Sequence, residues 1–282
     1  MRVLITGAGG QVGTELVATF AAAGHDVAAF TRAELDITSR DAVRAAVVEN
    51  RPDTIVHPAA WTAVDACESD PDRAFLVNGL ATRFIAESAA LVDAPVYYVS
   101  TDYVFDGTKA EPYVEWDEVG PASVYGASKL AGERELNPGS SIIRTSWVCG
   151  YHGANMVKTI LRLAGEHDRL SFVDDQRGHP TFAEDLAGMI ARLVTERRVG
   201  TFHVTNQGAV SWFEFAQEVL RAAGQDPARV QPVSTADLQP PRPAPRPANS
   251  VLDNAALRLS GVPLLDDFRE PLARLVARLS AD

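Results

Sequence analysis

The first half of the chain alternates short apolar runs with amphipathic segments. Runs of four to six residues, rich in Val, Ile and aromatic side chains, predict buried strands at 3–6, 27–30, 54–57, 96–100 and 141–146. Between the first two runs, apolar residues spaced along one helical face predict a helix that ends at Gly24. A second helix is predicted from about 71 to 91. Strands that alternate with helices predict an α/β fold with a doubly wound parallel sheet of the Rossmann type.

The second half is less regular, although two apolar runs, 170–175 and 201–206, are candidate strands. Ser211 followed three positions later by Glu214 predicts a capping box that begins a helix. We therefore expect a dinucleotide-binding domain over residues 1–145, with the strand near 200–206 as a candidate to rejoin its sheet. Residues 146–282 should form mainly a smaller α/β lobe over the substrate.

The segment 239–250, QPPRPAPRPANS, contains five prolines and cannot form a helix or a central strand. Two interpretations remain open at this point. The segment is either a semi-rigid connector or a stiff loop that presents Arg242 and Arg246 to an anion.

Composition narrows the function classes. Of the 282 residues, 46% are apolar and 22% are charged, which is ordinary for a soluble globular protein, and no apolar run approaches the length of about 18 residues that a membrane span requires. The net charge of −11 argues against nucleic acid as the main partner, because binding to phosphate backbones requires clustered Lys and Arg. Cys67 and Cys149 form no disulfide or metal-binding pattern, so a reducing cytoplasm is the expected location.

The segment GAGGQVG places Gly7, Gly10 and Gly13 in a G-x-x-G-x-x-G arrangement. It follows the first predicted strand and begins the first predicted helix. In that position, backbone N–H groups and the positive end of the helix dipole suit a pyrophosphate, so the motif predicts a dinucleotide site. The alternative is a tight strand-to-helix turn with no ligand.

The end of the second predicted strand bears on the choice of dinucleotide. An NAD site usually has an acidic residue there that binds the ribose hydroxyls, but this chain has Phe30-Thr31-Arg32. Because Arg32 would attract a 2′-phosphate, NADPH is favoured and NADH remains open. An ordinary solvated charge is the competing interpretation of Arg32.

Tyr125 precedes Lys129 by four positions at the start of a predicted helix, so the two side chains share one face. An ammonium beside a phenol, with an oxidised nicotinamide near by, favours the phenolate and lowers its pKa, which suits a tyrosine that exchanges a proton with a carbonyl oxygen. Thr101 ends the fourth predicted strand, at the edge of the sheet where α/β folds bind ligands. Its hydroxyl is expected to bond the same oxygen. The competing interpretations are two residues that merely share a helix face, and a threonine that satisfies a turn.

Together these residues resemble the extended short-chain dehydrogenase/reductases, and within them the chain is similar to the dTDP-4-dehydrorhamnose reductase family. Eight segments between residues 7 and 253 carry the resemblance: GAGGQVGTEL, LDIT, AAWTAVDACES, STDYVFDG, VYGASKLAGE, RTSWV, DDQRGHPT and RPANSVLD. The glycine and tyrosine motifs are common to the superfamily, whereas the others are more specific. The resemblance implies reduction of the 4-keto group of dTDP-4-dehydro-6-deoxy-L-mannose by NADPH, the last step of dTDP-rhamnose biosynthesis.

The resemblance also implies roles for particular residues. Tyr125 would be the proton donor, Lys129 would support it and the cofactor ribose, and Thr101 would tune the pair. The residues implied to line the cofactor, besides the glycines, are Gln11, Val12, Asp36, Ile37, Ala60, Trp61 and Thr62. Asp102 and Trp147 would contact the sugar, and the segment that begins at Arg246 would border the nucleotide end of the substrate.

Some features depart from the family pattern or leave alternatives. His57-Pro58 stands where the family more often has Asn-Ala, so the local cofactor contacts are open. Some relatives form a magnesium-dependent dimer; here a homodimer is an open expectation, and the sequence shows no metal site.

Tyr103 follows Asp102 where 4,6-dehydratases have a glutamate, which argues against dehydration. A sugar-nucleotide epimerase, or a non-catalytic dinucleotide-binding subunit like the regulatory subunit of methionine adenosyltransferase, remains an alternative.

Overall fold

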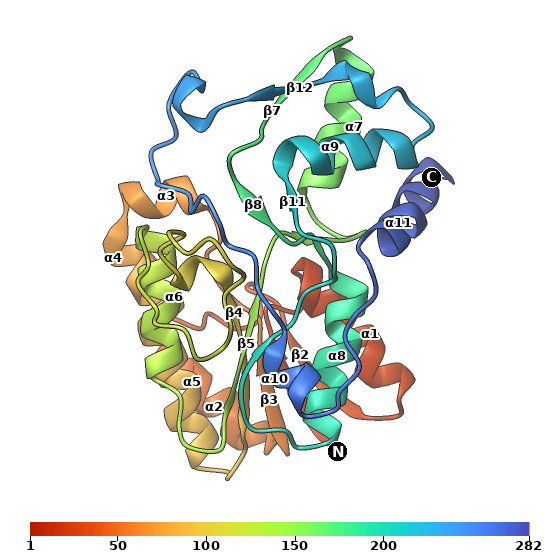
Figure 1. Cartoon of the computed structure of the whole chain (residues 1–282). Helices are drawn as coiled ribbons and strands as arrows, with labels where there is room; N and C mark the ends of the chain where they lie inside the picture. The colour runs from red at the N-terminus through yellow and green to blue at the C-terminus, as the bar shows by residue number, and fades with distance from the viewer. Residues whose placement is uncertain (282) are drawn as a thin grey trace.

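The structure, a computed structural model that describes residues 1–281, is built around a six-stranded sheet (Figure 1). All neighbouring strands of this sheet run parallel, in the order β10-β5-β4-β3-β1-β2. The strands are β1 (Arg2–Thr6), β2 (Asp26–Phe30), β3 (Thr54–His57), β4 (Val96–Thr101), β5 (Ser141–Thr145) and β10 (Gly200–His203). The five strands predicted in the first half are confirmed, and so is the doubly wound α/β fold.

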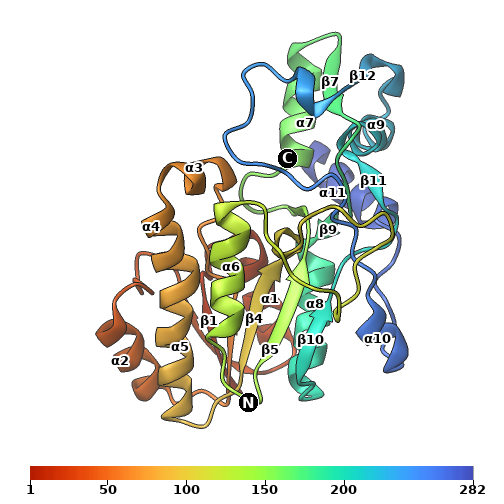
Figure 2. The ribbon, with the colours of Figure 1, turned by 60° about the vertical axis from the view of Figure 1, so that its left-hand side comes forward.

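Helices cover both faces of the sheet. Successive residues of a strand point to opposite faces, so each strand contributes side chains to both helical layers. Val3 and Ile5 of β1 pack toward one helical layer and Leu4 packs toward the other. The first layer contains α1 (Gln11–Ala22) and α8 (Ala183–Thr195), and the second contains α2 (Arg40–Asn50), α5 (Ala81–Ala90) and α6 (Val124–Arg134) (Figures 1 and 2). Both faces of the sheet are therefore buried, which explains why its strands are almost continuously apolar.

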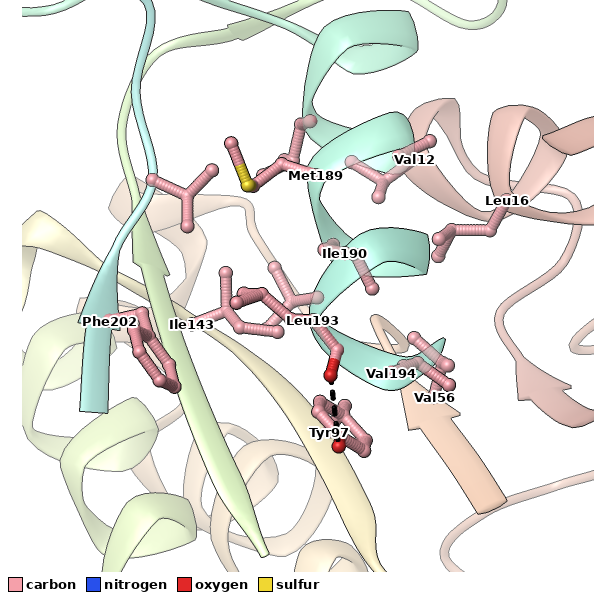
Figure 3. Packing of buried hydrophobic residues seen from close by; sticks show 14 of the residues in the cluster. Val12, Leu16, Val56, Tyr97, Ile143, Met189, Ile190, Leu193, Val194 and Phe202 are labelled. Atoms are coloured by element: carbon pink, nitrogen blue, oxygen red, sulfur yellow. Dashed lines mark hydrogen bonds between the residues drawn. The ribbon is translucent and has the colours of Figure 1, made fainter. Parts of the chain in front are cut away.

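Figure 3 shows the core beneath α1 and α8. Leu16 of α1 and Ile190 of α8 are fully buried against the strands, with Val56 and Ile143 beneath them. The hydroxyl of Tyr97 on β4 donates a hydrogen bond of 3.3 Å to the carbonyl oxygen of Leu193, near the end of α8. This packing fixes α1 and α8 against one face of the sheet.

The helix predicted from 71 to 91 is present but is not uniform. It consists of α4 (Pro71–Ala74), a π-helical segment η1 (Phe75–Leu80) and α5, and it follows the short helix α3 (Val64–Ser69). Single π-helical turns inside α-helices are often found near functional sites. Here the π segment contains Asn78, whose side chain is almost completely buried.

The later part of the chain forms a smaller α/β lobe above this edge (Figures 1 and 2). Its helices are α7 (Met156–Glu166), α9 (Trp212–Ala222) and α11 (Arg269–Ala281), which share one apolar cluster. Its short strands pair as β7 (Leu170–Val173) with β12 (Val230–Val233), β6 (Val148–Cys149) with β9 (Thr181–Phe182), and β8 (Arg177–Gly178) with β11 (Val210–Ser211). The lobe also contains the short helical segments η3 (Pro227–Arg229) and η4 (Thr235–Asp237), whereas η2 (Asp102–Val104) directly follows β4 and α10 (Ala255–Leu259) packs beside β10.

The lobe and the sheet are not consecutive in sequence, because β10 lies between two segments of the lobe and pairs in parallel with β5. α9 begins with the predicted capping box, in which Ser211 and Glu214 bond each other's backbone N–H groups. No helix within residues 1–281 combines the length and the apolar character that crossing a bilayer requires.

Candidate active site

A cleft of about 860 Å³ lies at the carboxyl ends of β1, β3 and β4 and extends beneath the lobe. The chain turns from β1 outward to β2 and then passes back to β3, so the sheet order reverses between β1 and β3. Open α/β sheets bind ligands at such reversals. With the exception of Arg246, every side chain or glycine that the sequence predicts for the site lines this cleft.

The turn between β1 and α1 forms the floor of the cleft. Gly7 has a φ of 60°, and a Cβ atom there would lie 2.8 Å from the Cα of Ala59. A Cβ on Gly13 would lie 2.1 Å from the carbonyl oxygen of Gly7, so α1 could not pack this closely with any other residue. Gly10 caps α1, whose first N–H groups carry the positive end of the helix dipole. This cradle fits the pyrophosphate of a dinucleotide.

The end of β2 supplies the part of the cleft predicted to select the dinucleotide. Thr31 is held by Glu34, which accepts hydrogen bonds from its N–H group at 2.8 Å and its hydroxyl at 2.7 Å. The Asp36 carboxylate accepts bonds from Thr38, which lower its pKa. Arg32 lines the cleft and is exposed, and no hydrogen bond or ion pair within residues 1–281 engages its guanidinium. Arg32 is therefore available to an anion.

The loop after β3 forms the next wall with Ala60, Trp61 and Thr62. Asn78 holds this loop, because its side chain accepts from the N–H of Trp61 at 2.8 Å and donates to the carbonyl of Trp61 at 3.1 Å. Its amide also donates to Ser128 of α6 at 2.9 Å. The sequence analysis did not identify Asn78, because it belongs to no motif. Its one local signal is that it is a polar residue within a long predicted helix.

Arg73 and Leu76 also line this wall and were not predicted. The guanidinium of Arg73 lies 4.4 Å from the centre of the Trp61 ring, a cation–π contact at the rim. Neither residue belongs to a motif in the sequence. Their contribution follows from the path of α4 and the π segment past the loop.

Tyr125 and Lys129 project from the first turns of α6 into the same cleft. α6 begins at Val124 because the Ser123 hydroxyl accepts from the N–H of Gly126, and Gly126 itself lets the helix approach Tyr103. The hydroxyl of Thr101, at the end of β4, lies near the Tyr125 phenol and acts to lower its pKa. The structure thus brings together the three residues predicted to perform the proton transfer.

The protonation states differ in one respect from the sequence prediction. The expectation that Lys129 lowers the pKa of Tyr125 applies beside an oxidised nicotinamide; in this structure burial raises the pKa of the phenol, and the Thr101 hydroxyl offsets that rise only in part. The Lys129 ammonium instead donates to the carbonyl of Val99 at 2.7 Å. Burial lowers the pKa of Lys129 to about 7, while Glu133 acts in the opposite direction. Tyr125 is therefore a protonated phenol at neutral pH, which is the state a proton donor requires.

Asp102 lies beside Thr101 and is 2% exposed. Its Oδ1 accepts a 2.9 Å hydrogen bond from the Thr101 hydroxyl. Burial raises the pKa of Asp102 to about 6, against the effect of Ser250 and Thr101. A hydroxyl that donates to Asp102 can still accept from Tyr125, so these three groups form a short polar chain in the cleft.

Trp147 contributes the wall toward the lobe. Its φ of 45° is unusual for a bulky residue. Its indole stacks on that of Trp212 at the start of α9, and a Cβ on Gly178 would collide with the same ring at 2.7 Å. Thr145 also lines the cleft and was not predicted; its buried hydroxyl has no hydrogen-bond partner among residues 1–281.

The structure does not place Arg246 in the cleft. Its guanidinium forms two hydrogen bonds with Asp65 of α3, at 2.6 and 2.9 Å, and lowers the pKa of that carboxyl. Arg242 approaches the same carboxylate at 3.6 Å. The proline-rich segment is thus held against α3 by its two arginines. Within residues 1–281 no group of three or more His, Cys, Asp or Glu side chains could hold a metal ion.

The parallel sheet, the glycine turn and the Tyr125/Lys129 pair on one cleft define the chain as an extended short-chain dehydrogenase/reductase. The sequence pattern of the family described as RmlD substrate binding domain matches residues 1–281, and the chain belongs to this family. It is 43% identical over 280 residues to the dTDP-4-dehydrorhamnose reductase of Streptomyces griseus, with 96% of this chain and 91% of that protein covered. The resemblance seen in the sequence is confirmed.

Solved structures agree with this assignment. A dTDP-4-dehydrorhamnose reductase from Clostridium acetobutylicum superposes with a TM-score of 0.95 at 41% identity, covering 99% of this chain and all of that one. The dTDP-4-dehydrorhamnose reductase from Bacillus anthracis, solved in complex with NADP, gives a TM-score of 0.93 at 40% identity, covering 98% of this chain and 99% of that one. The whole chain, including the smaller lobe, thus follows the architecture of these enzymes.

Proposed function

We propose that this protein is an NADPH-dependent dTDP-4-dehydrorhamnose reductase, which converts the C4 ketone of dTDP-4-dehydro-6-deoxy-L-mannose to the alcohol of dTDP-L-rhamnose in the last step of dTDP-rhamnose biosynthesis. The observation that carries the proposal is that Tyr125, Lys129 and Thr101 line the same cleft as the glycine turn. The identity of about 40% to reductases with this name supports the choice of substrate.

The chemistry follows from the states of the chain's own groups. A bound NADPH supplies the hydride to C4. Tyr125, kept protonated by burial, donates its proton to the substrate oxygen that becomes negative. The Thr101 hydroxyl holds the phenol in place and favours the phenolate that results. The Lys129 ammonium, when charged, stabilises this phenolate through the low dielectric of the cleft.

The choice of NADPH over NADH is supported by Arg32 at the end of β2 and by the absence of a carboxylate at the position after Phe30. An unengaged guanidinium attracts a 2′-phosphate, and Arg suits phosphate geometry well. The NADP complex of the Bacillus anthracis reductase agrees with this choice. The same cleft continues past Asp102 to Trp147, where the sugar of the substrate would lie.

We also propose that Arg246 contacts the substrate and that a domain boundary lies near residue 145. A homodimer and a cytoplasmic location are further parts of the proposal. In the described structure Arg246 pairs with Asp65, so a contact with substrate would require this ion pair to open. The division near residue 145 is supported by the separate apolar cluster of the lobe.

The reductase activity is tested by incubating purified protein with dTDP-4-dehydrorhamnose and either reduced nicotinamide cofactor. We expect loss of NADPH absorbance and formation of dTDP-L-rhamnose. Tyr125→Phe should lower kcat by about 10²–10⁴-fold, while Tyr97→Phe, on the opposite face of the same sheet, should leave it nearly unchanged. Unchanged absorbance with both cofactors would contradict the proposal. Cofactor that stays bound through purification without net consumption would favour an epimerase.

A further inference from the structure

The ammonium of Lys129 lies 4.0 Å from the centre of the Tyr98 ring, on the ring face. Tyr98 belongs to β4, lies beneath α6 and is completely buried. No motif in the sequence marks it, because it occurs within an apolar strand. We propose that Tyr98 is a positioning residue for the reduction: its ring face keeps Lys129 charged and directs the ammonium toward Tyr125 and the cofactor ribose. This inference rests on the proposed function.

The geometry around Tyr98 supports a built contact. The Tyr98 hydroxyl donates to the carbonyl oxygen of Asn78 at 3.2 Å, which ties β4 to the π segment. On α6, Gly132 leaves the room for this hydroxyl, since a Cβ there would lie 2.4 Å from it. On the other side the ring packs against His57, with 5.5 Å between ring centres. The ring is therefore held on three sides and cannot move away from the ammonium.

A lysine ammonium has three N–H donors. One is used by the carbonyl of Val99 at 2.7 Å, and the Tyr98 face occupies a second direction. Because Lys129 also lines the cleft, the remaining donor is available to a ligand there. The negative face of an aromatic ring attracts a cation most strongly where water is excluded, and Lys129 is 1% exposed.

The other titratable groups around Lys129 do not replace this attraction. Glu133, one turn further along α6, favours the charged lysine, but its oxygens already accept from Arg144 and Ser100. His57 on β3 is kept neutral, because burial and the charge of Lys129 lower its pKa to about 3. Tyr125 is a neutral phenol in its resting state.

Asp102 completes the set of nearby ionisable groups. It acts on Tyr125, with which it shares the Thr101 hydroxyl. Glu133 and Asp102 are therefore already bonded to other residues, whereas the ring face of Tyr98 is free to attract the Lys129 ammonium.

The experiment uses the low lysine content of the chain, which has Lys109, Lys129 and Lys158 only. With ¹³C-labelled lysine, three side-chain signals can be followed by NMR against pH, and Lys129→Met identifies the signal of interest. We expect a midpoint of about 7 for Lys129 in the unaltered protein. Tyr98→Leu should lower that midpoint by about one pH unit or more, because a desolvated cation–π contact is lost. Tyr98→Phe keeps the ring and should leave the midpoint unchanged.

Tyr97→Leu is the matched control, since Tyr97 is equally buried on the same strand but points to the opposite face. It should lower stability and leave the Lys129 midpoint unchanged. If Tyr98→Leu does not fold, trifluorinated phenylalanine at position 98 keeps the shape of the Tyr98→Phe ring and weakens its negative face. The midpoint should then fall relative to Tyr98→Phe.

In turnover assays, the alkaline fall in kcat of Tyr98→Leu should move to lower pH by the same amount, while that of Tyr98→Phe stays in place. The inference is overturned if the Lys129 midpoint is the same in Tyr98→Leu, in Tyr98→Phe and in the variant with trifluorinated phenylalanine at position 98. The lysine titration does not depend on turnover, so it distinguishes failure of this inference from failure of the proposed reductase activity.

Discussion

The indole of Trp147 stacks on that of Trp212 with 3.6 Å between ring centres and an angle of 11° between planes. One tryptophan follows β5 and the other begins α9, so the contact joins the sheet to the lobe. Trp147 has a positive φ, a conformation that costs about 1–3 kcal/mol and persists when surrounding contacts enforce it. Trp212 is such a contact, and it orients the wall of the cleft next to Asp102.

Trp212→Leu should raise the KM for the sugar nucleotide by about 3- to 10-fold, because stacked aromatic pairs contribute about 0.5–1.5 kcal/mol beyond their buried area. The KM for NADPH should change little, since Trp212 does not line the cleft beside the glycine turn. Steady-state kinetics with each substrate varied in turn gives both values. Trp212→Phe keeps an aromatic ring and is the control. An equal rise in both KM values would show general damage to the cleft.

Tyr125→Phe removes the phenol that donates the proton and keeps the ring that packs with Cys67 and Ala74. We expect kcat to fall by about 10²–10⁴-fold, the range that general acid catalysis contributes. Fluorescence titration should give a dissociation constant for NADPH close to that of the unaltered protein. A kcat close to that of the unaltered protein would mean that another group supplies the proton.

Arg32→Glu places a carboxylate at the end of β2, where it would repel a 2′-phosphate and accept bonds from ribose hydroxyls. The KM for NADPH should rise by about tenfold or more, equivalent to about 1.4 kcal/mol, while the KM for NADH should fall or stay the same. Arg44→Glu makes the same charge change on the exposed face of α2, outside the cleft, and should alter neither value. A parallel loss with both cofactors would exclude a role for Arg32 in cofactor choice.

His57 is buried between Thr6, whose hydroxyl lies 2.6 Å from Nδ1, and Thr82. Its pKa in the folded protein is lowered from 6.5 to about 3, so between these values the unfolded chain binds more protons. Stability should therefore fall as pH decreases through this window, by at most about 1.4 kcal/mol per pH unit from this residue. His57→Asn should reduce the slope of unfolding free energy against pH there. His203 and His179 have lowered pKa values too, so a slope should remain.

An unchanged slope in His57→Asn would show that His57 is not protonated on unfolding in this range. Denaturant unfolding at several pH values between 4 and 7, at constant ionic strength, gives the slopes. His167→Asn, which makes the same change at an exposed histidine, serves as the control.

The fold was predictable to a large extent because its signals are local. The strands of the first half are short apolar runs, and a side chain at Gly13 is excluded by the backbone of Gly7 and Ala8, only a few positions earlier. The capping box of Ser211 and Glu214 involves residues only three positions apart. Such features depend on period, turn geometry and short spacing, which a single sequence contains.

The residues that sequence reasoning missed lie in elements with no local signal. Asn78 belongs to a helix and Tyr98 to an apolar strand, yet one holds the loop of Trp61 and the other carries the Lys129 ammonium on its ring. Arg246 is a different case: the resemblance implied a contact with the substrate, and the structure shows its ion pair with Asp65, 181 positions away, which no local pattern predicts.

By itself, the sequence determined the doubly wound sheet, the nucleotide turn and the pair Tyr125 and Lys129, because each depends on neighbours within a few positions. The tertiary structure alone decided the charge states of that pair. Burial raises the pKa of the phenol and lowers that of the lysine, and burial is a property of packing between β4, α6 and the π segment. The free energy of a charge depends on everything around it, which no short stretch of sequence contains.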